Sequence, residues 1–276
     1  MNKILKNIIN YILSLITPLV KDETKIASIY TLISKLLFDK KNNLEYSKEF
    51  NSYWLKHDEE YLFLVKAPYY NFSKKNLYKS IFDIYCKNYS PKANDIIIDI
   101  GAGIGTETLF FHEKIGLYGK IYSIEASTDS YNKLNALCSK NKISNSTNFN
   151  IAISNFCGKI WIEETENFEV NQINIKQKGI EIKCFTLDQF IIDNSITSID
   201  LLKVNIEGAE LEMIDGMFSS IKIIKNIAVS CHDFLFTENK NIKQTIINFL
   251  TNNGFVIFFN NTGNKVTDSW IYGKRK

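Results

Sequence analysis

The chain has 276 residues, of which 45% are hydrophobic, and can therefore bury a sizeable core. Its net charge is only +3 at pH 7, and Arg275 is the single arginine among 33 basic residues. Because bidentate recognition of phosphate and guanine depends on arginine, we expect no nucleic-acid partner. The five cysteines include no Cys-x-x-Cys pair, which predicts reduced thiols in a cytoplasmic protein rather than disulfides or a zinc site.

Residues 3–20 place apolar side chains at helical spacing and predict an amphipathic helix that ends near Pro18. Lys6, Asn7 and Asn10 interrupt the apolar run, so the segment is too short for the roughly 20 apolar residues that a bilayer requires. Two interpretations stay open. The helix either makes peripheral contact with a membrane, or packs on the rest of the chain or on a partner subunit of a homo-oligomer.

The next segments predict a second helix over residues 25–38 and a polar linker over residues 39–47. Residues 44–90 are rich in aromatic side chains, most of which we expect in the core. Tyr69 and Tyr70 follow Pro68 in a predicted loop, where they either belong to that core or line an acceptor or cofactor pocket.

A buried strand over residues 96–100 leads directly into a glycine-rich turn, which predicts a nucleotide-binding site. A dinucleotide fingerprint would need glycine at Thr106, and a phosphate loop would need Gly-Lys-Ser/Thr, which the turn lacks. The remaining pattern, an acidic residue two positions before Gly-x-Gly-x-Gly, is typical of S-adenosylmethionine-dependent methyltransferases. The residues concerned are Asp99, Gly101, Gly103 and Gly105.

The next two predicted strands add candidate ligands for the cofactor. Residues 120–125 form a strand that ends in Glu125, where a carboxylate can accept hydrogen bonds from the ribose hydroxyls of a bound adenosine. Ala126 follows directly. Residues 148–153 predict the third strand, with Asn150 and Ala152 expected near the adenine at its carboxyl end.

A third motif, Lys-Val-Asn-Ile-Glu-Gly-Ala-Glu at residues 203–210, identifies a family. With the glycine turn, the Ile-Glu-Ala end of the second strand and Phe-Thr-Leu-Asp-Gln-Phe at residues 185–190, it resembles the FkbM-type methyltransferases over roughly residues 78–260. The resemblance implies methyl transfer from S-adenosylmethionine to a hydroxyl, often of a sugar, glycolipid or polyketide. Two departures stand out: Asn205 replaces the family's usual Asp, and Ala126-Ser127 replaces its usual Pro.

The predicted fold is α/β, a Rossmann-like seven-stranded methyltransferase sheet of order 3-2-1-4-5-7-6 with an amino-terminal helical extension and an inserted β-hairpin. The hairpin comprises residues 159–162 and 179–184, and its polar loop over 163–178 either covers the acceptor or is a solvated connection. We place the domain boundary between residues 1–75, the extension, and 76–276, the methyltransferase domain.

Strands four and five lie side by side in this order, so Asn205 should meet His232 and Asp233 at their carboxyl ends. A sugar hydroxyl is a weak acid, and its methylation requires a general base or a cation on the oxygen. We expect His232 as a base near neutral pH, Glu207 as the remaining carboxylate, and Asn205 with Asp233 as ligands for Mg²⁺.

Two alternatives from other classes remain. The chain can be a non-catalytic module that binds S-adenosylmethionine but has lost acid-base function at Asn205. A nicotinamide-dependent oxidoreductase is disfavoured by the missing glycine at Thr106. The partner expected for an O-methyltransferase is a hydroxylated small molecule or glycan.

Overall fold

The computed structural model describes residues 3–38, 42–58, 60–163, 172–174, 179–233 and 241–276. The chain divides into two compact units, Met1–Leu77 and Tyr78–Lys276. Helix α3 (Lys74–Tyr85) contains the boundary between them.

The first unit begins with α1 (Lys3–Ile16), which ends in the 3₁₀ turn η1 (Thr17–Leu19) where Pro18 stops the α-helix, and continues with α2 (Glu23–Phe38). Ile9 and Leu13 are the buried side of α1 and pack with Tyr70, Ile29 and Ile33. The other apolar side chains of α1 and η1 are exposed. They are Ile4, Leu5, Ile8, Tyr11, Ile12, Leu15, Ile16 and Leu19.

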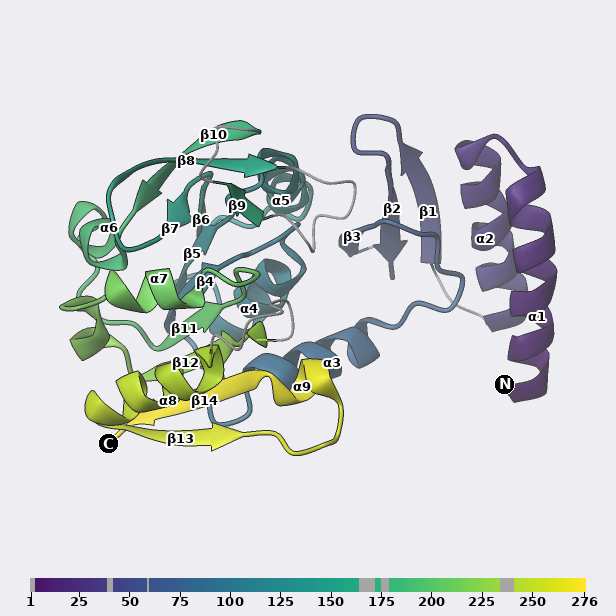
Figure 1. Ribbon diagram of the computed structural model, residues 1–276. Coiled ribbons are helices and arrows are strands. Elements are labelled where there is room, and N and C mark those ends of the chain that lie inside the picture. Colours follow the sequence, from purple (N-terminus) through teal and green to yellow (C-terminus); the bar gives the residue numbers. More distant parts are fainter. Residues whose placement is uncertain (1–2, 39–41, 59, 164–171, 175–178, 234–240) are drawn as a thin grey trace. The chain divides into compact units, whose positions relative to one another are not determined.

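Three antiparallel strands complete this unit in the order β1 (Asn42–Ser47), β2 (Ser52–His57) and β3 (Tyr61–Val65) (Figure 1). The linker predicted over residues 39–47 is therefore wrong from Asn42 onward, and residues 39–41 lie outside the described part. Leu44 is buried and its backbone N–H bonds the Thr31 hydroxyl at 2.9 Å, so tertiary packing overrides the polar composition of this segment.

The second unit is built on a seven-stranded sheet of order β13-β14-β12-β11-β4-β5-β6 (Figure 1). This confirms the predicted order 3-2-1-4-5-7-6. β14 pairs antiparallel with β12 and β13, and the other neighbouring strands of this sheet pair in parallel. The strands are β4 (Ile96–Ile100), β5 (Lys120–Ile124), β6 (Ser146–Phe149), β11 (Leu201–Val204), β12 (Asn226–Ser230), β13 (Phe255–Phe259) and β14 (Trp270–Arg275).

Successive side chains of the central strands point to opposite faces of the main sheet, and helices pack on both faces. Ile98, Ile100, Leu202 and Val204 join one core cluster that includes side chains of α6 (Leu187–Asp193), α7 (Glu210–Asp215) and α8 (Ile242–Asn252). The residues that alternate with these point to the other face, where α4 (Thr106–Ile115) packs. The Thr108 hydroxyl of α4 lies 3.1 Å from the hydroxyl of Ser123 on β5. The remaining helical segments are α5 (Thr128–Lys140), η3 (Ser220–Ile223) and α9 (Lys265–Asp268).

A second sheet has the order β7-β10-β8-β9. Its strands are β7 (Ala152–Ile153), β8 (Gly158–Glu163), β9 (Gln172–Asn174) and β10 (Ile180–Phe185). The antiparallel pairing of β8 with β10 confirms the inserted hairpin. Its predicted loop falls mostly on residues 164–171 and 175–178, outside the described part.

The third strand of the main sheet is shorter than predicted. It ends at Phe149, and Ala152 leaves the sheet to pair with β10.

Within the described residues, no helix has the length and apolar content needed to cross a bilayer.

Candidate functional site

The three glycines after β4 all have positive φ, at +76° for Gly101, +54° for Gly103 and +91° for Gly105, but their surroundings differ. A Cβ on Gly101 would lie 1.9 Å from the backbone oxygen of Asn205, and one on Gly105 would lie 2.6 Å from Leu134 Cδ1. A Cβ on Gly103 would meet nothing within 4 Å. Packing therefore requires glycine at Gly101 and Gly105, whereas Gly103 faces open space that a ligand can fill.

A buried ion pair lies beneath this turn. Asp99 and Lys203 are partners in the register of β4 and β11, and Lys203 Nζ is 2.8 Å from Asp99 Oδ1 and donates to the Gly101 carbonyl at 2.7 Å. Both side chains are almost fully buried, at 0% and 2% exposed. Asp99 was expected to bind the cofactor. The structure instead makes it a support, because it holds the lysine that fixes the Gly101 backbone.

The pKa values of this pair follow from burial and charge. Burial raises the pKa of Asp99 to about 6, against the opposing effect of Lys203. Burial alone would lower the pKa of Lys203, but the carboxylates of Asp99, Glu107 and Glu125 outweigh it and raise that pKa. Both groups are therefore charged at neutral pH. The Lys203 ammonium also lies 5.5 Å from the centre of the Tyr85 ring, which covers it.

Glu125 follows β5 and binds the turn from the side. Its Oε2 accepts the Gly103 N–H at 2.8 Å and its Oε1 accepts the Ser127 N–H at 2.9 Å. Burial raises the pKa of Glu125, although these two N–H groups lower it. A carboxylate has about four lone-pair sites, so hydroxyls of a ligand can still bind the same oxygens.

Asn150 holds the chain after Glu125 in place. Its amide donates to the carbonyls of Glu125 and Ala126 at 3.0 and 3.1 Å and accepts from the Thr128 hydroxyl at 3.1 Å. Asn150 and Ala126 thus lie beside Glu125. Ala152 does not, because it is buried in the core of the second sheet with Ile160 and Ile182.

The ends of β11 and β12 assemble a chain of three ionisable side chains. His232 Nδ1 lies 2.5 Å from Glu210 Oε1, and His232 Nε2 lies 3.3 Å from Glu207 Oε2. Glu210 is fully buried and also accepts the Gly208 N–H at 3.1 Å, which fixes its carboxylate. Glu207 is 22% exposed and adopts φ +50°, a left-handed conformation that is uncommon for residues other than glycine.

The two carboxylates set the protonation of the imidazole. Burial alone would lower the pKa of His232, but the hydrogen bonds and charges of Glu207 and Glu210 outweigh it and raise the pKa to about 9. His232 is therefore mostly protonated at pH 7. The expectation that it is a free base near neutral pH is wrong, because the sequence did not reveal that two carboxylates surround it.

Of the two residues expected to hold Mg²⁺, Asp233 does not fit a metal site. Asp233 accepts the N–H groups of Ile242 and Lys243 at 2.6 and 3.0 Å, so its carboxylate is engaged by the first turn of α8. The backbone of Asn205 bonds the Ile100 carbonyl at 2.9 Å at the end of β11. In the described part of the chain, no group of three or more His, Cys, Asp or Glu side chains could hold a metal ion.

Sequence reasoning assigned no role to Lys203 or Glu210, although both stand in the quoted motif. A lysine inside an apolar strand and a glutamate two residues after a glycine were the available signals. Their roles depend on partners from distant segments, Asp99 for Lys203 and His232 for Glu210.

The strand order and the glycine turn define an α/β protein of the Rossmann-like methyltransferase class. The model of the methyltransferase FkbM domain matches residues 99–257, which is more than half of the chain. The chain therefore belongs to the FkbM methyltransferase family.

Among solved structures, methyltransferase FkbM from Methylobacillus flagellatus KT is 16% identical, with a TM-score of 0.48 over 65% of this chain and 43% of that one. The chain thus spans less than half the length of that protein. Fibrillarin from Aeropyrum pernix, in complex with S-adenosyl-L-methionine, is 13% identical, with a TM-score of 0.47 over 81% of this chain and 94% of that one. No curated protein matches the sequence significantly. The family assignment rests on the match over residues 99–257.

The buried pair gives a first prediction. Asp99→Asn should lower the free energy of unfolding by about 3–5 kcal/mol, because it leaves the Lys203 ammonium buried without its partner. Replacing both residues, Asp99→Leu with Lys203→Met, should recover most of that loss. Urea unfolding of the full chain measures both. The control is Asp83→Asn, which breaks the exposed Lys79–Asp83 pair and should cost less than about 1 kcal/mol. An equal, small effect of both single changes would contradict the role given to Asp99.

The raised pKa of His232 gives a second prediction. A histidine whose pKa is higher in the folded state stabilises the fold below its unfolded pKa, and this contribution disappears as the pH rises through the folded value. For His232 the window runs from about 6.5 to about 9. The wild type should therefore lose up to about 3 kcal/mol across it relative to His232→Gln.

Urea unfolding at several pH values measures this difference. The matched control is His112→Gln, since His112 lies in the same unit and bonds the Asn145 amide at 2.6 Å rather than a carboxylate. His112→Gln should keep the wild-type pH dependence. The assignment fails if His232→Gln keeps it as well.

Proposed function

We propose that the Tyr78–Lys276 unit transfers a methyl group from S-adenosylmethionine to a hydroxyl of a sugar, a glycolipid or a related small molecule. The observation that carries this proposal is the Glu207–His232–Glu210 chain, which lies at the carboxyl ends of strands β11 and β12. In parallel α/β sheets ligands bind outside these ends, and here the glycine turn follows the next strand, β4.

The turn has the features that a nucleoside-containing cofactor needs. Gly103 leaves open space, and the neighbouring Glu125 carboxylate keeps acceptor capacity for ribose hydroxyls. When bound, S-adenosylmethionine supplies a methyl group activated by its sulfonium. The residues proposed to hold it are Gly101, Gly103, Glu125 and Ala126.

Methyl transfer to a hydroxyl also requires a group that accepts the hydroxyl proton. The two carboxylates that contact His232 are the candidate acceptors. Glu207 is the group that receives the proton, because Glu207 is partly exposed whereas Glu210 is fully buried. His232 is a positioning residue. Its charge and hydrogen bond hold the Glu207 carboxylate, and Glu210 holds the imidazole.

No step of this chemistry depends on Mg²⁺. The family assignment favours methyl transfer over the nicotinamide-dependent oxidoreductase. A non-catalytic binding module is distinguished by its behaviour, because it would bind S-adenosylhomocysteine but turn over none of the hydroxylated acceptors offered to it.

A third prediction tests the cofactor site. S-adenosylhomocysteine should raise the melting temperature of the wild type, and NAD should not. Gly103→Val should abolish the shift, because its side chain fills the open space that faces the ligand. Gly263→Val is the matched control, since Gly263 lies in the same unit, also has a positive φ, +78°, and leaves an added Cβ with nothing within 4 Å. It should keep the shift. Retention of the shift in Gly103→Val would show that the cofactor lies elsewhere.

A fourth prediction tests the proton acceptor. Glu207→Gln should lower kcat by about 10²–10⁴ and leave the affinity for S-adenosylhomocysteine unchanged, because the carboxylate acts on the acceptor alone. Formation of S-adenosylhomocysteine with a panel of glycosides, glycolipids and polyols measures turnover. The control Glu212→Gln changes an exposed carboxylate of α7 and should remain as active as the wild type. Near-normal turnover by Glu207→Gln would remove this residue from the mechanism.

A further inference from the structure

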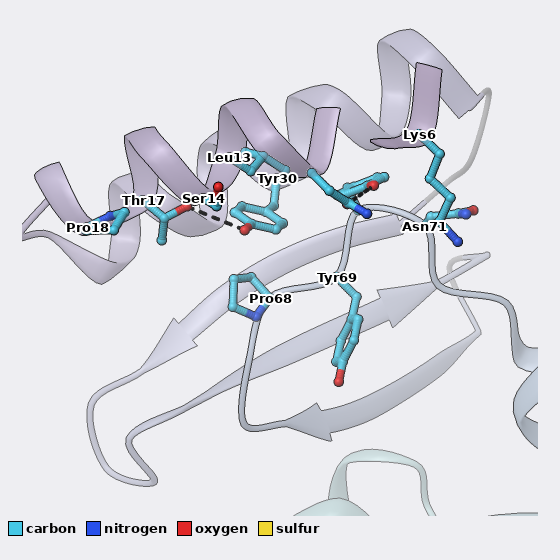
Figure 2. A pocket seen from close by; sticks show the side chains of 11 residues that line it. Lys6, Leu13, Ser14, Thr17, Pro18, Tyr30, Pro68, Tyr69 and Asn71 are labelled. Atoms are coloured by element: carbon cyan, nitrogen blue, oxygen red, sulfur yellow. Dashed lines mark hydrogen bonds between the residues drawn. The ribbon is translucent and has the colours of Figure 1, made fainter. Parts of the chain in front are cut away.

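The Met1–Leu77 unit contains a pocket of about 520 Å³. One wall is the polar side of α1 and η1, and the other is the loop after β3 (Figure 2). The side chains that line it are Lys6, Asn10, Leu13, Ser14, Thr17, Pro18, Tyr30, Pro68, Tyr69, Tyr70 and Asn71. Its volume lies within the range of small-molecule binding sites.

The inner part of this pocket is held by contacts within the unit. The Tyr70 hydroxyl donates to Asn10 Oδ1, and the Tyr30 hydroxyl lies 3.4 Å from that of Thr17. The rings of Tyr30 and Tyr70 are 6.1 Å apart, and Tyr70 is buried with Leu13. These residues join α1, α2 and the loop, so the walls are formed before a ligand binds and little ordering cost remains.

The outer part has a different composition. Tyr69 is 52% exposed although it is a large aromatic side chain, whereas its neighbour Tyr70 is 6% exposed. Ser14 donates its hydroxyl proton to the Tyr11 carbonyl at 2.7 Å, which leaves its oxygen as an acceptor. Asn71 supplies an amide and Lys6 an ammonium. The described lining residues include no Asp or Glu.

We propose that this pocket binds a saccharide, with the apolar face of a sugar ring on Tyr69 and ring hydroxyls on Asn71, Ser14 and Lys6. Sugar hydroxyls both donate and accept hydrogen bonds, and side-chain amides and hydroxyls can do the same. Aromatic rings bind the apolar faces of sugars, and a tyrosine hydroxyl adds orientation. A purely apolar ligand would leave the polar groups of this lining without partners, which costs free energy. This pocket belongs to the Met1–Leu77 unit and the glycine turn to the Tyr78–Lys276 unit, and saccharide binding does not depend on methyl transfer.

The test uses the full chain and a printed array of neutral and acidic oligosaccharides, followed by calorimetric titration with the strongest binder. Tyr69→Ala should weaken binding about tenfold or more, and Tyr69→Phe should stay within about threefold of the wild type, because the ring face remains. Since Tyr69 is half exposed, neither change should alter the circular dichroism spectrum.

The matched control is Tyr11→Ala. Tyr11 is 66% exposed, lies on α1 in the same unit and does not line the pocket. It should bind the saccharide as the wild type does.

All three variants should keep the thermal shift with S-adenosylhomocysteine, so a failure at the cofactor site would be recognised separately. The proposal is overturned if no saccharide on the array binds the wild type, or if Tyr69→Ala and Tyr11→Ala bind equally well.

Discussion

The ion pair between Asp99 and Lys203 is the interaction on which the cofactor end of the sheet depends. It joins the two central strands, β4 and β11, at the point where both end, and the lysine also holds the Gly101 carbonyl. A buried ion pair of this kind contributes little net stability compared with apolar residues of similar size. What it contributes is placement, because the backbone of the glycine turn is fixed relative to the end of the neighbouring strand.

The same strand end supplies the second half of the site. Glu207 and Glu210 follow the end of β11, and both contact His232, which follows β12. Parallel strands bring these segments together because their carboxyl ends lie at one edge of the sheet. The two charged groups differ in purpose. The Asp99–Lys203 pair is buried and holds the backbone of the turn, whereas the row of Glu210, His232 and Glu207 ends in a partly exposed carboxylate.

The fold could be predicted from the sequence wherever apolar periodicity was strong. The order of the main sheet and the hairpin of β8 and β10 follow from β-branched runs and from the family motif. The strand β1 was missed because its polar residues resemble a linker, and its pairing with β2 is decided by tertiary contacts such as Leu44 with Thr31. The sequence also did not predict that the carboxylates around His232 raise its pKa. Sequence brings residues 207, 210 and 232 to one edge of the sheet, but it does not give the distances that raise a pKa.

Asn205 can be understood from the charge of this site. In the family pattern an aspartate usually stands at this position, two residues before Glu207. A carboxylate there would add a negative charge close in sequence to Glu207 and Glu210, and like charges repel. A neutral amide avoids that repulsion. The substitution therefore leaves the proposed proton acceptor, the Glu207 carboxylate, in place.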